Sequence, residues 1–387
     1  MIALTAARLY TPLDRIDKPL LLIENGAIAR LTSAEESPAP RDARRVDLGD
    51  AVLAPGFVDI HIHGGAGHDV MRADSAGLAA MERLLAAHGV SSYFPTTVTA
   101  PLDATLAALD HLAGVIEAAE QRQPEKTAGA RPLGIHLEGP FISHARRGVH
   151  PPENLLPPTI EAFDRFWQAA RGHIRMITIA PELPGAREVI AEAARRGVCV
   201  SLGHSDADLE TARAAVAAGA RHATHTFNAM RPLGHRDPGI IGEVLTDARL
   251  SADIVVDGIH VASEVVQVFL HEKGVEKTVL ITDATAATGM PDGRYCLGTL
   301  EVEVKNGMCT HNGGLAGSVL TMDRAIRNVM QFGHWTLQQA VRAATWNPAQ
   351  VAGLAGRGVL KEGARADFVV LSPEGEIRNT IISGVGV

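Results

Sequence analysis

Short apolar runs alternate with helix-like segments between residues 52 and 283. This alternation is typical of βα units that build a parallel sheet. The eight apolar runs are Val52 to His63, Ser92 to Thr99, Leu133 to Glu138, Arg175 to Ala180, Val198 to His204, His222 to Phe227, Leu250 to Val256 and Thr278 to Asp283. Helices are predicted between and after them at Ser75 to His88, Leu102 to Gln121, Ala186 to Arg196, Leu209 to Ala218, Ala262 to Glu272, Asp323 to Phe332 and Leu337 to Thr345. Eight parallel strands close a barrel, so the pattern predicts an α/β fold of the TIM (β/α)8 type.

Both chain ends have a different pattern, in which short strand-like runs are separated by turns such as Asn25-Gly26 and Pro373-Glu374-Gly375. We expect the two ends to pair into one small β-sandwich domain. The predicted division is residues 1–51 and 357–387 for the small domain and residues 52–356 for the barrel. The segment Asp292 to Gly314 leaves two placements open, a β-hairpin on the barrel or a part of the small domain.

Composition supports an α/β body, because hydrophobic residues make up 46% of the chain and aromatic residues only 4%. The net charge is −8 and no Lys or Arg run interleaves with aromatic residues, which argues against nucleic-acid binding. Three scattered cysteines without CxxC spacing favour a reducing compartment. No apolar run approaches the ~18 residues that cross a bilayer and no signal peptide is visible, so we expect a cytoplasmic protein without a membrane segment.

Residues with metal-binding or acid-base side chains gather at the predicted strand ends. They are His61 and His63 after the first strand, Glu138 after the third, His204 after the fifth, His225 after the sixth and Asp283 after the eighth. The carboxyl ends of barrel strands form the active site, and imidazole is the commonest metal ligand. A single histidine is more often a surface or core residue, but joint placement at five strand ends in a chain with 17 histidines indicates a metal site. His136 lies two residues deeper than Glu138 and is interpreted as a supporting group.

Several strings of residues carry a resemblance to a known family. They are Pro55-Gly56-Phe57 before His61-Ile62-His63, His136-Leu137-Glu138-Gly139-Pro140, Gly148-Val149-His150-Pro151, Gly203-His204-Ser205, Thr224-His225-Thr226-Phe227-Asn228-Ala229-Met230, Asp257-Gly258-Ile259-His260, Thr282-Asp283-Ala284 and Leu315-Ala316-Gly317-Ser318-Val319-Leu320-Thr321-Met322. The chain resembles the amidohydrolase superfamily and, over essentially its whole length, the family of N-acetylglucosamine-6-phosphate deacetylases. The resemblance implies deacetylation of N-acetyl-D-glucosamine 6-phosphate to D-glucosamine 6-phosphate and acetate in amino-sugar catabolism.

The same resemblance implies a ligand set. Glu138, His204 and His225 would hold one divalent metal, and His61 and His63, sharing Glu138, would hold a second. Zinc and iron both suit these ligands, with one or two ions per subunit. Bound metal lowers the pKa of water towards ~7, and the resulting hydroxide attacks an amide carbonyl. Asp283 is the expected general base and acid, which takes the proton of that water and delivers it to the amine.

The resemblance also implies which residues bind the substrate. His150 would contact the amide, and His260, Arg236 and the backbone of Asn228 and Ala229 would contact the phosphate. In relatives the loop that corresponds to the one bearing Arg236 reaches the neighbouring subunit, which implies a homodimer with Arg236 contributed across the interface.

Three alternatives stay open. The first is the same chemistry on the galactosamine epimer or on another N-acyl sugar. The second is an amidohydrolase barrel kept as a non-catalytic scaffold, which predicts lost ligands, whereas all five ligand positions and Asp283 are filled here. The third is a cyclic-amide hydrolase such as a dihydroorotase, against which the fourth strand, Arg175 to Ala180, lacks the lysine that bridges two metals in many relatives.

Overall fold

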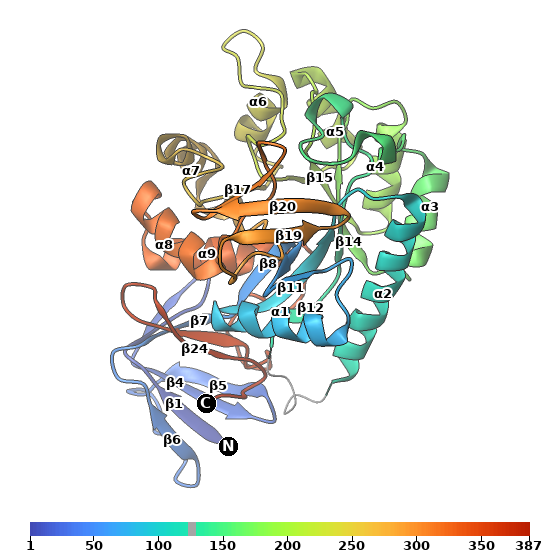
Figure 1. Cartoon of the computed structure of the whole chain (residues 1–387). Helices are drawn as coiled ribbons and strands as arrows, with labels where there is room; N and C mark the ends of the chain where they lie inside the picture. Colours follow the sequence, from blue (N-terminus) through green and yellow to red (C-terminus); the bar gives the residue numbers. More distant parts are fainter. Residues whose placement is uncertain (123–128) are drawn as a thin grey trace.

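The computed structural model describes residues 1–122 and 129–387. Its centre is a curled parallel sheet in which neighbouring strands follow the chain order (Figure 1). The strands are β8 (Phe57–Ile62), β11 (Val90–Thr97), β13 (Ile135–Glu138), β14 (Ile174–Ile179), β15 (Cys199–Leu202) and β16 (His222–Ala223), with the two-residue β12 (Arg131–Pro132) beside β11. Every residue of β11 is buried. Helices cover the outer face of the curled sheet, and side chains of the other strands fill its inner face. The fold is therefore mixed α/β with a parallel sheet, as predicted.

Strands β17 (Ala252–Val255) and β18 (Thr278–Ile281) form a separate parallel pair that meets both ends of the curled sheet. On one side, the amide of Ala223 donates to the carbonyl of Ser251 at 3.0 Å. On the other side, the amide of Asp283 donates to the carbonyl of His61 at 2.9 Å. These hydrogen bonds bring the end of β18 beside the end of β8, and so place Asp283 next to the His61-Ile62-His63 segment.

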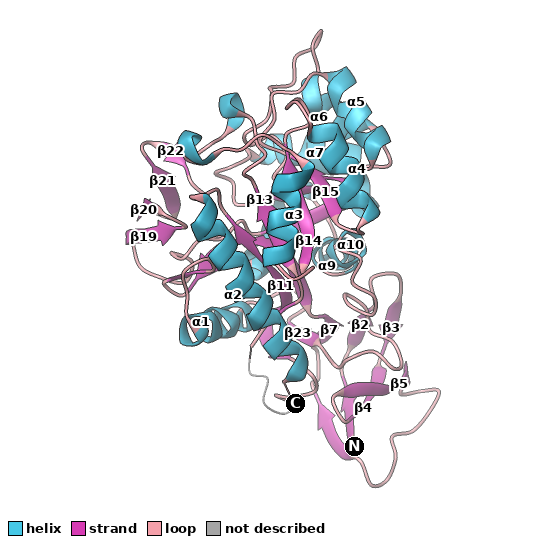
Figure 2. Cartoon of the chain, turned by 90° about the vertical axis from the view of Figure 1, so that its right-hand side faces the viewer, coloured by secondary structure: helices cyan, strands magenta, loops and turns pink. Residues whose placement is uncertain are grey.

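Helices follow the strands and lie on the outside of the curled sheet (Figures 1 and 2). They are α1 (Ser75–Ala87), α2 (Leu102–Gln121), α3 (Ile160–Ala169), α4 (Ala186–Arg195), α5 (Leu209–Ala218), α6 (Gly239–Thr246), α7 (Ser263–Lys277), α8 (Met322–Gly333), α9 (Leu337–Ala344) and α10 (Trp346–Val351). The pattern did not predict α3, α6 or α10. Of these, α6 is short and buried almost throughout, so it has no polar face and no helical period. No helix in residues 1–122 or 129–387 is long and apolar enough to span a membrane.

Two sheets from the chain ends form a second unit below the α/β body (Figure 2). One contains β5 (Ala27–Ser33), β4 (Pro19–Glu24), β1 (Ile2–Thr5) and β6 (Arg44–Asp47); the other contains β24 (Ile377–Ile381), β23 (Phe368–Leu371), β7 (Val52–Pro55), β2 (Arg8–Tyr10) and β3 (Arg15–Asp17). Leu4 and Leu21 of the first sheet share a buried cluster with Leu9, Leu53 and Phe368 of the second. The second sheet therefore joins strands from both chain ends, whereas the first contains N-terminal strands alone.

The predicted first strand, Val52 to His63, is wrong as a single element. It is two strands, because β7 pairs with β2 and β23 in the second terminal sheet, whereas β8 pairs with β11 in the central sheet. The chain passes between them at Gly56, where a Cβ atom would lie 2.4 Å from Ser91 Oγ. A residue without a side chain is required there, since the backbone runs against its neighbour.

The segment whose placement was open forms an antiparallel sheet of β19 (Gly293–Leu297), β20 (Leu300–Lys305), β21 (Met308–His311) and β22 (Gly314–Leu315). Figure 1 shows it in orange in front of the central strands. Leu297 and Val302 share a buried cluster with Val98 and Ala287, which belong to the α/β body. The segment therefore lies on the body, together with a hairpin of β9 (Gly64–Gly65) and β10 (His68–Asp69) and two short 3-10 helices, His144–Arg146 and Pro152–Asn154.

Candidate metal and active site

Glu138, at the end of β13, lies at the centre of a cluster of buried histidines. Its Oε1 atom is 3.1 Å from His225 Nε2, 3.3 Å from His204 Nε2 and 3.4 Å from His61 Nε2. Its Oε2 atom is 3.4 Å from His63 Nε2. Two groups of possible metal ligands therefore share one carboxylate, namely His61 with His63 and Glu138, and Glu138 with His204 and His225.

The distances within the second group fit a tetrahedral ion. His204 Nε2 and His225 Nε2 are 3.0 Å apart, and both are 3.1 to 3.3 Å from Glu138 Oε1. Four ligands at about 2.0–2.1 Å from zinc are separated from each other by about 3.3 Å. The three atoms thus surround a point where a metal of that size fits.

Backbone carbonyls orient two of the imidazole rings. Nδ1 of His63 lies 3.0 Å from the carbonyl oxygen of Thr96, and Nδ1 of His204 lies 3.0 Å from that of Arg146. A carbonyl only accepts, so Nδ1 carries a proton, and Nε2 is the atom of the neutral ring that is left to bind a metal. This is the tautomer that a metal ligand requires.

The electrostatics of the cluster call for a cation. Burial lowers the pKa of His204 to about 4. Burial also opposes protonation of His225, yet Glu138 raises the pKa of that ring to about 9. Although burial raises the pKa of Glu138, the surrounding imidazoles, His61 first, hold it well below its ordinary value. A buried carboxylate that faces this many imidazoles favours a positive charge between them, and these residues are of the types that could hold a metal ion.

Asp283, just beyond β18, faces the same cluster. Its Oδ1 atom is 3.2 Å from His63 Nε2 and 3.6 Å from His61 Nε2. Burial raises the pKa of Asp283, but the charges of these two imidazoles lower it below its ordinary value. The carboxylate is therefore ionised at neutral pH and able to accept a proton.

Three of the clustered residues have left-handed backbone conformations, with φ of 46° at His204, 30° at His225 and 50° at Asp283. This region is uncommon for residues other than glycine, and it concentrates at functional sites where the surroundings impose it. At His225 the restraint is visible, because its amide donates to Asp253 Oδ1, and Asp253 Oδ2 is 2.9 Å from His222 Nε2. Asp253 had no place in the sequence prediction; its position on β17 gives no local signal for a role beside β16.

A pocket of about 190 Å³ opens above the cluster. The predicted site residues that line it are His63, Glu138, His150, His204, His225, Asn228, Ala229, His260 and Asp283. His61 is fully buried beneath them. Arg236 is not among the lining residues; it lies on the exposed loop 231–238 ahead of α6, which protrudes from the body in Figure 1.

Hydrogen bonds define how His150 and His260 face this pocket. The amide of Thr99 donates to Nδ1 of His150 at 3.2 Å, so that ring carries its proton on Nε2, which points towards Glu138 Oε2 at 3.6 Å. His260 places Nδ1 2.7 Å from Asp257 Oδ2. His136 behaves differently, because its two ring nitrogens contact the carbonyl of Ile60 and the hydroxyl of Thr178 beneath the cluster, as its interpretation as a supporting group requires.

Residues 52–387 match the amidohydrolase family. The chain belongs to the amidohydrolase family. Among curated relatives of this amidohydrolase, an N-acetylglucosamine-6-phosphate deacetylase of Bos taurus is 42% identical, over 87% of this chain and 84% of the relative. An N-acetylgalactosamine-6-phosphate deacetylase of Escherichia coli O157:H7 is 38% identical, over 98% of both chains. The resemblance seen in the sequence is thereby confirmed.

A solved structure agrees with these relatives. It is N-acetyl-D-glucosamine-6-phosphate deacetylase of Mycobacterium smegmatis, an aspartate-to-alanine mutant in complex with N-acetyl-D-glucosamine-6-phosphate. Its TM-score is 0.92 at 35% identity, and the match covers 99% of this amidohydrolase and 98% of that chain. The shared fold thus extends over the terminal sheets as well as the α/β body.

The sequence prediction missed the apolar residues of the pocket of this amidohydrolase. Val98, Val149, Leu297 and Leu315 line it together with the polar groups. Leu297 and Leu315 belong to the β19–β22 sheet, whose placement the sequence left open. The string Leu315-Ala316-Gly317 was part of the family resemblance, so the sequence did contain a signal that Leu315 lies near the site.

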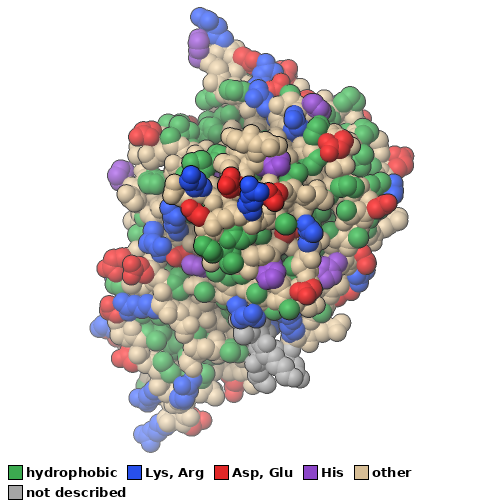
Figure 3. Space-filling view, in the orientation of Figure 1, with side chains coloured by type: hydrophobic (Ala, Val, Ile, Leu, Met, Phe, Trp, Pro, Cys, Tyr) green, Lys and Arg blue, Asp and Glu red, His purple; other side chains and the backbone are tan. Residues whose placement is uncertain are grey.

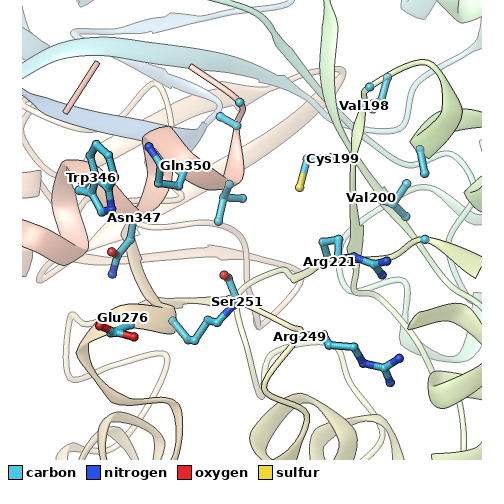
Figure 4. Close-up of a pocket in the computed structure, with 17 residues that line it drawn as sticks. Val198, Cys199, Val200, Arg221, Arg249, Ser251, Glu276, Trp346, Asn347 and Gln350 are labelled. Atoms are coloured by element: carbon cyan, nitrogen blue, oxygen red, sulfur yellow. The ribbon is translucent and has the colours of Figure 1, made fainter. Parts of the chain in front are cut away.

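A larger cavity, of about 590 Å³, lies at the opposite end of the strands (Figure 4). Cys199, Arg221 and Ser251 stand at the starts of strands there, facing Trp346 and Asn347. Burial raises the pKa of the Cys199 thiol to about 12, so it is not a nucleophile at neutral pH. On the face that Figure 3 shows, acidic and basic side chains are interspersed. The candidate active site is therefore the pocket above Glu138.

Proposed function

We propose that this amidohydrolase hydrolyses N-acetyl-D-glucosamine 6-phosphate to D-glucosamine 6-phosphate and acetate. The observation that carries the proposal is the ionised Asp283 carboxylate, 3.2 Å from His63 Nε2, beside a buried Glu138 and histidine cluster. The curated relatives and the substrate-bound structure support the choice of amide.

Glu138, His204 and His225 would hold one divalent metal, and His61, His63 and Glu138 would hold a second. Both groups have the imidazole and carboxylate donors that zinc and iron accept. When bound, the metal would lower the pKa of water towards ~7 and polarise the amide carbonyl. We favour a site able to hold two ions, since both histidines of the His61 pair point to the shared carboxylate.

The remaining chemistry belongs to side chains of this chain. Asp283 would accept the proton of the attacking water and then deliver it to the departing amine, which must leave protonated. His150 Nε2, which carries the ring proton, would donate to the carbonyl oxygen as negative charge develops on it. Asn228, Ala229 and His260 line the same pocket and would hold the sugar phosphate.

Arg236 would contact the phosphate in a neighbouring subunit rather than in its own. Its exposed position, outside the lining of its own pocket, supports this assignment. We therefore propose a homodimer in which each subunit completes the other's site, in the cytoplasm, where a phosphorylated sugar is available.

The test is acetate release by protein of known metal content from N-acetyl-D-glucosamine 6-phosphate. Rapid, metal-dependent release is the expected result. Protein that contains metal but releases no acetate would rule out the proposed substrate, and protein that binds no metal would favour the non-catalytic scaffold.

The galactosamine epimer is a second candidate substrate, favoured by the relative from Escherichia coli O157:H7, which matches 98% of both chains. The two sugars differ only in the configuration of one hydroxyl group, so the metal cluster and Asp283 would act alike on both. Comparing kcat/KM for the two epimers, each with and without the phosphate, distinguishes them.

The hydrogen bonds that join β17 and β18 to both ends of the curled sheet support a closed TIM barrel, and we propose that closure. The two terminal sheets with their shared core support a β-sandwich. We propose the predicted division into residues 1–51, 52–356 and 357–387, with β7 reassigned to the small domain because it pairs there.

A further inference from the structure

One wall of the active-site pocket is apolar, whereas the rest of its lining carries the ligand-type and hydrogen-bonding residues. Val98, Val149, Leu297 and Leu315 form this apolar wall. Val98 and Leu297 are each 2% exposed and belong to one buried cluster, against which Val149 packs. Three of the four wall residues are therefore packed together, and Leu315 completes the lining beside them.

A second cavity, of about 750 Å³, adjoins the pocket on this side. Gly148, Val149, His150 and Leu315 line both cavities. Glycine has no side chain and His150 has a polar role, so Val149 and Leu315 are the apolar side chains that separate the two spaces. Leu315 lies on the short edge strand β22 and is 37% exposed, so it is the member of the wall with the least packing around it.

We propose that the apolar wall is the acyl-binding surface of this enzyme, and that Leu315 and Val149 restrict the acyl group to acetyl. The inference rests on the proposed function. An N-acetylhexosamine phosphate carries hydroxyl groups, a phosphate and one methyl group bonded to the reacting carbon. The methyl group makes no hydrogen bonds with water. It can therefore be buried against an apolar wall without leaving a polar group unpaired.

The apolar wall also limits the length of the acyl chain that the pocket accepts. A longer acyl chain, such as butyryl, would extend from the reacting carbon into Leu315 and Val149. Removing either side chain would connect the 190 Å³ pocket with the 750 Å³ cavity and give the extra methylene groups a place to lie. Hydrophobic pockets discriminate about 10- to 200-fold per methylene, so the effect on specificity is measurable.

The experiment compares N-acetyl- and N-butyryl-D-glucosamine 6-phosphate as substrates for the wild-type, Leu315→Ala and Val149→Ala enzymes, by release of the common amine product. The matched control is Leu300→Ala, because Leu300 lines the larger cavity but not the pocket. We expect the ratio of kcat/KM for butyryl over acetyl to rise at least tenfold, or roughly the value of one methylene, in Leu315→Ala and to rise in Val149→Ala. The ratio in Leu300→Ala should stay at the wild-type value.

The outcomes separate the two proposals. A wild-type enzyme that cleaves the acetyl substrate, with an unchanged ratio in both Leu315→Ala and Val149→Ala, would overturn the acyl wall and leave the proposed function standing. An equal rise in Leu300→Ala would also overturn it, since that residue lies outside the pocket. A metal-loaded wild type inactive on the acetyl substrate would overturn both proposals.

Discussion

The Nε2 atoms of His204 and His225 lie 3.0 Å apart, with the same oxygen of Glu138 in contact with both. Two neutral imidazoles cannot both direct lone pairs at that distance without a proton or a cation between them. Burial lowers the pKa of His204 to about 4, whereas Glu138 outweighs burial at His225 and raises its pKa to about 9. The two imidazoles are thus placed to share one positive charge, either a proton or a cation.

Removing the shared carboxylate should empty the site. We expect Glu138→Ala to retain less than about a fifth of the wild-type metal, because it removes a ligand from both groups. Elemental analysis after dialysis gives the metal content. Glu192→Ala, which removes a partly buried carboxylate paired with Arg195 and Arg196 outside the site, should keep wild-type content. Full metal content in Glu138→Ala would refute the shared-ligand arrangement.

Asp283→Asn should separate metal binding from proton transfer. An amide keeps the shape of the side chain but cannot accept the proton of the attacking water, so kcat should fall about 10²- to 10⁴-fold. Metal content should stay near wild type. Initial rates with metal analysis on the same samples check both points, and substantial turnover by the variant would contradict the proton-carrier role.

The His61 pair should govern the number of ions. The double variant His61→Gln, His63→Asn removes two ligands of the first group and none of the second. We expect about one ion per subunit and retained activity, if Glu138, His204 and His225 hold the primary ion as in a three-ligand catalytic site. Loss of all metal would instead make the His61 pair part of the primary site.

Asp253 should stabilise the fold through His225 and His222. Its carboxylate accepts from the His225 amide and contacts His222 Nε2 at 2.9 Å, all fully buried. We expect Asp253→Asn to lower the free energy of unfolding by about 1.5–3 kcal/mol, as for a buried hydrogen bond to a charged group. Urea unfolding measures it. The exposed pair Asp50 and Arg378 supplies the control, since Asp50→Asn should cost less than about 1 kcal/mol.

Lys273 should make stability depend on pH in the alkaline range. Burial lowers the pKa of its ammonium group from 10.5 to about 8, although Nζ donates to the carbonyls of Val244 and Asp247. Between those two values the unfolded chain binds the proton and the folded chain does not, so stability rises with pH. Below pH 8 both states are protonated and the contribution is constant.

The measurement is urea unfolding from pH 7.5 to 10 of wild type and Lys273→Met. The free energy of unfolding of wild type, relative to the variant, should increase across this range. Lys305→Met, at an exposed lysine, should show no such relative increase. A flat difference for Lys273→Met would mean that its pKa is not lowered.

The sequence by itself determined the α/β class, the strand-like terminal runs and the six side chains at strand ends. These follow from local properties, because a short apolar run marks each central strand and the first polar residues after the run stand at the end of the strand. For the same reason His61, His63, Glu138, His204, His225 and Asp283 were identified before any contact was known.

Only the tertiary structure decided which of these residues share Glu138, that β7 leaves the central sheet at Gly56, and that β19–β22 lies on the α/β body. It alone shows that Asp253 accepts a hydrogen bond from the His225 amide and that Leu297 shares a buried cluster with Val98. Such pairs are formed by residues far apart in the chain, and neither member differs locally from an ordinary core residue. Their partnership depends on how the sheet curls and how β19–β22 packs on it, and these are set by packing over the whole molecule.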